Sequence, residues 1–196
     1  DNILAVEYAV AQGADVINMS FGGYDNDTLF KDAIDDAVGE GVVCVGAGGN
    51  DNVTATHYPS DYDSCISVIS TTSIDTKSSF SNYGSAKDIS APGSSIKSTF
   101  YTGGYATYSG TSMAAPMVSG VVALMLSANP SLSVDDVKQI LYDTAVDLGD
   151  EGIDEYFANG RVDASAAVAE AVGGSSILDI RFVSEKVQIT TATGTT

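Results

Sequence analysis

Two short apolar segments separated by an amphipathic helix constrain this chain most. Residues 15–20 and 42–46 are apolar enough for buried strands. Between them, Asp27 can cap a helix to about Glu40 whose apolar side chains share one face. Two strands joined through a helix pair in parallel. The pattern therefore predicts an α/β domain, with a further short strand over 65–70.

The remaining predicted elements divide the chain near residue 173. Residues 112–127 form a helix of apolar and small residues, which we expect to be buried. Gly-Gly-Ser-Ser at 173–176 predicts a linker before a β-rich tail to residue 196, which could begin a further domain. Other predicted elements are helices over 2–12, 133–144 and 163–172, a hairpin of strands near 95–99 and 105–108, and strands over 177–183 and 187–191.

Charge excludes several partner classes. The chain has 26 acidic and 8 basic residues, a net charge of −18. Nucleic acids and anionic membrane surfaces are recognised through clustered Lys and Arg, so we expect neither as a partner. The negative charge also has a simpler use, which is to keep the protein soluble. We see no apolar run as long as the ~18 residues of a membrane span, and expect no membrane insertion.

Both cysteines, Cys44 and Cys65, lie in apolar segments. Free buried thiols are the first expectation, and a disulfide between neighbouring strands is the alternative. Two cysteines are too few for a scaffold held together by disulfides.

A glycine-rich segment after the second strand suggests a nucleotide site, but only weakly. Gly46-Ala47-Gly48 follows a strand, as in dinucleotide-binding folds. The third glycine of that pattern is replaced by Asp51, and no helix is predicted to follow. A pyrophosphate would therefore find no helix N-terminus.

The segment Gly110–Pro116 places Ser112 at the start of a buried helix. Serine at such a position is often only an N-cap. Here small residues surround it, and the helix N-terminus favours negative charge developing nearby. Ala114 distinguishes the segment from the Gly-x-Ser-x-Gly motif of α/β-hydrolases.

Gly110–Pro116 resembles the nucleophile motif of the subtilisin-like serine proteases. Segments 15–23, 47–51, 58–59 and 90–93 resemble other family motifs in the same order, so the resemblance covers residues 1–172. It implies a three-layer α/β/α fold with a mainly parallel sheet, of which the N-terminal part is missing. It also implies a serine endopeptidase acting on polypeptides, and a secreted or cell-surface location.

The resemblance assigns roles to individual residues. Ser112 would be the nucleophile, and the Asn50 amide would donate a hydrogen bond to the oxyanion. Taken without the resemblance, Asn50 is better explained as a turn residue. Two segments would flank the substrate and its first specificity pocket: Ser20, Phe21 and Gly22 on one side, and Ala47, Gly48 and Gly49 on the other.

His57 is the only histidine, and three roles are open to it. The resemblance places it at the base of the specificity pocket, where we expect it to favour acidic or polar substrate side chains. The alternatives are a surface-loop residue and the catalytic base. Family order puts the triad Asp and His before the segments seen here, so we expect both to lie upstream of Asp1.

Without those residues the chain should be inactive alone, because serine is a poor nucleophile without a base. We also expect the missing part to leave apolar surface exposed. The alternative function is a pseudoprotease that binds peptides. Where relatives often carry His after Pro116, this chain has Met117.

No cofactor is required for the chemistry. The resemblance suggests a structural calcium or monovalent cation at Asp75, with backbone carbonyls near Ser60 and Tyr62 as further ligands. The alternative is that Asp75 is an exposed turn residue.

Overall fold

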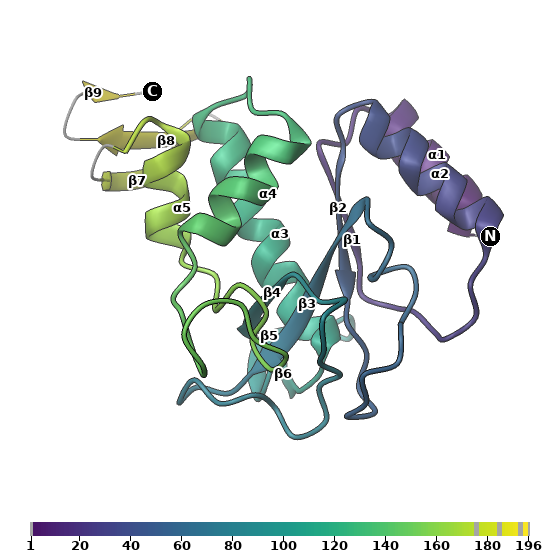
Figure 1. Cartoon of the computed structure of the whole chain (residues 1–196). Coiled ribbons are helices and arrows are strands. Elements are labelled where there is room, and N and C mark those ends of the chain that lie inside the picture. The colour runs from purple at the N-terminus through teal and green to yellow at the C-terminus, as the bar shows by residue number, and fades with distance from the viewer. Residues whose placement is uncertain (1, 175–176, 184–185, 192–193, 196) are drawn as a thin grey trace.

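A four-stranded parallel sheet forms the middle layer of the fold (Figure 1). The computed structural model describes residues 2–174, 177–183, 186–191 and 194–195. The strands lie in the sheet in chain order. They are β1 (Val16–Met19), β2 (Val43–Ala47), β3 (Cys65–Thr71) and β4 (Ile89–Pro92).

Helices cover both faces of this sheet, which confirms the three-layer prediction. One face carries α1 (Asn2–Ala11) and α2 (Thr28–Gly39), and the other carries α3 (Thr111–Ala128). Figure 1 places α4 (Val134–Asp143) and α5 (Ala164–Ala171) beyond α3. Side-chain alternation on β2 explains the two cores, because Val43 and Val45 face α3 while Cys44 faces α1 and α2.

Cys44 and Cys65 are register partners on β2 and β3, and both thiols are free and buried. Burial raises the pKa of Cys44 to about 11, and it also raises the pKa of Cys65. The expectation of free buried thiols is therefore confirmed.

Helix α3 is more apolar than the sequence analysis allowed. By length and composition it could cross a membrane, which corrects the statement that no such run exists. The helix instead packs along the sheet, with Ala114, Val118, Val122 and Met125 fully buried. This is the position of a core helix in a layered α/β domain.

The C-terminal half contains two further small sheets. The predicted hairpin is confirmed as β5 (Ile96–Thr99) and β6 (Tyr105–Tyr108), with positive φ at Gly103 and Gly104. In the tail, β7 (Ile177–Val183), β8 (Lys186–Thr191) and β9 (Gly194–Thr195) pair antiparallel. Residues 175–176 of the predicted linker lie outside the described residues, and the domain division there stays a prediction.

Candidate active site

Ser112 lies in the first turn of α3, one residue inside the helix. The N-cap is Gly110, which makes no side-chain cap bond, so Ser112 is not serving as the cap. Its Oγ instead donates to the backbone oxygen of Ser20, 3.0 Å away. The hydroxyl is partly exposed at the positive end of the helix dipole, a position that favours an anion beside it.

Asn50 is tied to this helix N-terminus by its amide oxygen. Oδ1 accepts hydrogen bonds from the backbone N–H of Thr111 at 2.8 Å and from its hydroxyl at 3.0 Å. Within residues 2–174, the Nδ2 group of Asn50 has no hydrogen-bond partner. The amide is therefore anchored to Thr111, the residue that precedes Ser112, and its donor is free, as an oxyanion site requires.

Thr111 lies at the centre of the contacts around Asn50, although the sequence alone did not single it out. It is fully buried, and its hydroxyl accepts from the Gly49 N–H at 3.2 Å while donating to Asn50. One hydroxyl thus joins the end of β2 to the start of α3. A hydroxyl residue directly before the proposed nucleophile, within the Gly110–Pro116 motif, was the available signal.

The predicted substrate-binding segment runs beside Ser112. Ser20 Oγ donates to the backbone oxygen of Ser112 at 2.9 Å. Together with the bond from Ser112 Oγ to the Ser20 oxygen, this makes two reciprocal hydrogen bonds between the two serines. Beyond it, Gly23 and Tyr58 exchange two backbone bonds of 2.8 and 2.7 Å. Phe21 is 45% exposed and stacks on Phe30.

The opposite wall needs its glycines for packing as well as for pocket width. Gly48 donates to the backbone oxygen of Val68, and a Cβ on Gly48 would lie 2.8 Å from that oxygen. Gly49 has φ of +101°, and a Cβ there would lie 2.1 Å from Nδ2 of Asn82. Ala47, at the end of β2, is buried in the core.

His57 lies between the two walls. A Cβ on Gly22 would be 2.4 Å from its Cε1, and one on Gly49 would be 3.0 Å from its Cδ2. The residue is only 7% exposed, which does not suit a surface loop. Burial, and next the charge of Lys87, lower the pKa of His57, so the imidazole is neutral at pH 7.

No general base is present around Ser112 in the described residues. The His57 ring is directed to Ser60 and to the backbone of Ala47, and no bond joins it to Ser112. The alternative of His57 as the base therefore finds no support in the geometry.

Asp75, the expected cation ligand, forms an ion pair with Arg161, with 2.9 Å between Oδ1 and Nε. Throughout residues 2–174, no three His, Cys, Asp or Glu side chains converge as a metal site.

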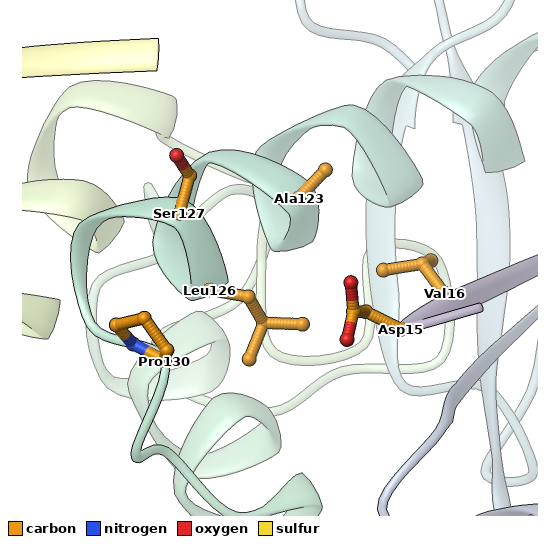
Figure 2. A pocket seen from close by; sticks show the side chains of 6 residues that line it. All are labelled: Asp15, Val16, Ala123, Leu126, Ser127 and Pro130. Carbon is orange, nitrogen blue, oxygen red and sulfur yellow. The ribbon is translucent and has the colours of Figure 1, made fainter. Parts of the chain in front are cut away.

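The hollow drawn in Figure 2 is far from this chemistry. It has a volume of about 460 Å³ and lies between the start of β1 and the last turns of α3. Ala123 on its wall is eleven residues along α3 from Ser112, or about 16 Å of helix. Its polar lining consists of Asp15 and Ser127, which offer no base to Ser112.

A free amide donor and a helix N-terminus beside one serine hydroxyl, on a three-layer α/β fold, form the arrangement that an oxyanion site requires. Comparison with known proteins makes this specific: the chain belongs to the subtilase family, whose model matches residues 1–160.

Three relatives illustrate the match. Subtilisin DY of Bacillus licheniformis is 40% identical over 169 residues, covering 84% of this chain and 61% of that protein. Thermitase of Thermoactinomyces vulgaris is 44% identical over 163 residues, covering 83% and 57%. The halolysin-like extracellular serine protease Nep of Natrialba magadii is 43% identical over 164 residues, covering 84% and 30%. The chain spans about six-tenths of the first two.

A solved structure agrees with the fold. The prenylagaramide maturation protease PagA superposes with a TM-score of 0.79 at 31% identity, over 88% of this chain and 66% of that one. The predicted fold class is thereby confirmed.

Proposed function

We propose that this chain is the nucleophile-bearing part of a subtilisin-like serine endopeptidase. Ser112 Oγ attacks the scissile carbonyl, an acyl-enzyme forms as the amine leaves, and water then releases the acid. The observation that carries the proposal is the anchored amide of Asn50: its Oδ1 is bonded to Thr111 at the start of the helix that bears Ser112, and its Nδ2 has no partner within residues 2–174. Its polypeptide substrate would lie extended along Ser20–Gly22.

The base and its orienting carboxylate come from an upstream part of the same domain. Support for this comes from Ser112, which has no basic partner in residues 2–174. It comes also from β1, which pairs with β2 on one side and with no described strand on the other. An unpaired edge and exposed apolar side chains such as Leu4 and Tyr8 need a cover. The chain alone would therefore be inactive and prone to association.

The proposed location rests on the family. One relative is named as extracellular, which supports a secreted or cell-surface protein here. The alternative function is a peptide-binding pseudoprotease whose upstream triad residues have been lost. Asp75 stays the proposed ligand of a structural cation, and its carboxylate is paired with Arg161 in this structure.

Fluorophosphonate labelling tests the proposal, because the probe reacts with an activated serine. The intact protein, its Ser112→Ala variant and the present chain alone are compared. We expect labelling only of the intact protein, lost in the variant. A folded, mature intact protein that stays unlabelled would instead favour the pseudoprotease. Labelling of the chain alone at Ser112 would place a base within it.

A further inference from the structure

The imidazole of His57 fills the space between the two proposed pocket walls. The ring occupies the space that a Cβ would need at Gly22 on one wall, near Cε1, and at Gly49 on the other wall, near Cδ2. The edge of the Tyr24 ring covers it, with 5.4 Å between the ring centroids. A substrate side chain entering between these walls therefore meets the ring instead of an open slot.

A buried ion pair fixes the loop that carries this ring. Nζ of Lys87 lies 2.6 Å from both carboxylate oxygens of Asp61, and the two side chains are 1% and 0% exposed. Asp61 Oδ2 accepts from the backbone N–H of His57 at 2.9 Å, and its own N–H donates to the His57 oxygen. Oδ1 also accepts from the hydroxyls of Ser60 and Ser67.

This arrangement makes displacement of His57 costly. Swinging the loop outward would separate Asp61 from Lys87 or expose a fully buried pair, and breaking such a pair strongly destabilises a protein. The ring is thus a fixed part of the pocket and not a gate. The ring therefore limits how far a substrate side chain can enter between the walls.

The charges around the imidazole give the pocket no preference for an acidic substrate side chain. Four titratable groups face the imidazole from neighbouring segments: Lys87, Asp61, Asp51 and Tyr24. The ammonium of Lys87 is already paired with Asp61, so no free cation is left for an acidic substrate side chain. The pocket can therefore discriminate between substrate side chains by their size.

We propose that His57 closes the primary specificity pocket, so that the enzyme cleaves after residues with short side chains: Gly, Ala or Ser. Lys87 and Asp61 act as positioning residues that hold the ring in place. This inference rests on the proposed function, since it names the substrate class of the same site.

Cleavage of matched peptide p-nitroanilides by the intact enzyme tests this. The substrates differ only in the residue before the scissile bond, which is Gly, Ala, Ser, Leu, Phe or Glu. We expect kcat/KM for Ala to exceed that for Phe, Leu and Glu by at least about tenfold, the discrimination that even one excess methylene produces in a closed pocket. The variants His57→Gly and His57→Ala should raise kcat/KM for Phe and Leu relative to that for Ala by a similar factor.

Controls separate the outcomes. Thr56→Gly introduces the same flexibility in the same loop at an exposed position and should keep the wild-type preference. Fluorophosphonate titration of each variant gives the concentration of active enzyme, so a misfolded His57→Gly protein is recognised and His57→Ala replaces it. Equal cleavage after Ala and Phe by the wild type, a preference for Glu, or no gain in either His57 variant would overturn the inference. Absence of labelling in the wild type would instead refute the proposed function.

Discussion

At the scale of single residues, the hydroxyl of Thr111 connects the proposed nucleophile to its oxyanion donor. It donates to Asn50 Oδ1 and accepts from the Gly49 N–H. Thr111→Val keeps the shape and removes both bonds, so we expect the Asn50 amide to lose its fixed direction. Removing an oxyanion donor altogether costs about 10²–10³ in kcat, a range that comes from subtilisin, a member of the same family. We expect Thr111→Val to lower kcat by about tenfold, with little change in KM.

Steady-state kinetics on the intact enzyme, normalised by fluorophosphonate titration, measures this effect. Thr107→Val is the matched control, because Thr107 is exposed on β6. An unchanged kcat in Thr111→Val would show that Asn50 needs no help from this hydroxyl, and an equal loss in the control would remove the local explanation.

The residue scale also shows what a sequence can and cannot reveal. Ser112 and Asn50 stand in short segments whose composition and order indicate their roles. The pair Lys87–Asp61 joins residues 26 positions apart, and nothing local to either one predicts it. The contact between Asp75 and Arg161 is equally unpredictable, since Arg161 lies far along the chain.

At the scale of elements, Gly46 allows β2 to pack closely against the neighbouring loop. A Cβ at this position would lie 2.6 Å from the Cα of Ser60, in the loop that carries His57. Backbone cannot yield as a flexible side chain can, so Gly46→Ala must push the loop away from the strand. We expect a loss of about 1–3 kcal/mol in the free energy of unfolding. Urea unfolding of the intact protein with Ser112→Ala, which prevents self-digestion, gives the value.

Gly120→Ala in α3 is the matched control. A Cβ at Gly120 meets nothing within 4 Å, and alanine is favoured over glycine inside a helix by about 1 kcal/mol. The two substitutions should therefore change stability in opposite directions. If both had the same sign, contact with the Ser60 loop would not be the cause.

Elements with strong local signals were predicted well. Asp27, Ser133 and Asp163 each cap a helix that begins at the next residue. β4 was missed, because its four residues include Ser90 and Pro92, and its burial comes from packing in the sheet. Part of its edge is covered from far away, where Ser90 exchanges backbone bonds with Gly160 and Val162. Long-range pairing of this kind leaves no periodicity in the sequence.

At the scale of the whole molecule, charge is strongly unbalanced. The chain carries a net charge of −18, and residues 2–174 contain three ion pairs. Few carboxylates are therefore paired with a cation, and some are close to like charges. Asp36 on α2 has Asp32 and Glu40 four residues away on either side. Repulsion among them opposes the folded state most at low ionic strength, where the Debye length is about 30 Å.

We therefore expect the thermal unfolding midpoint of the intact Ser112→Ala protein to rise as NaCl increases from about 0.01 M to 1 M, where the Debye length falls to about 3 Å. KCl should act equally, because screening depends on ionic strength and not on the cation. Asp36→Lys turns two repulsive pairs into attractive ones, so it should raise the unfolding midpoint in dilute buffer. The midpoint of this variant should then increase less with salt than that of the parent protein. A midpoint that is independent of salt, or that responds to sodium alone, would mean that carboxylate repulsion does not limit stability. It would also mean that the acidic surface serves solubility only.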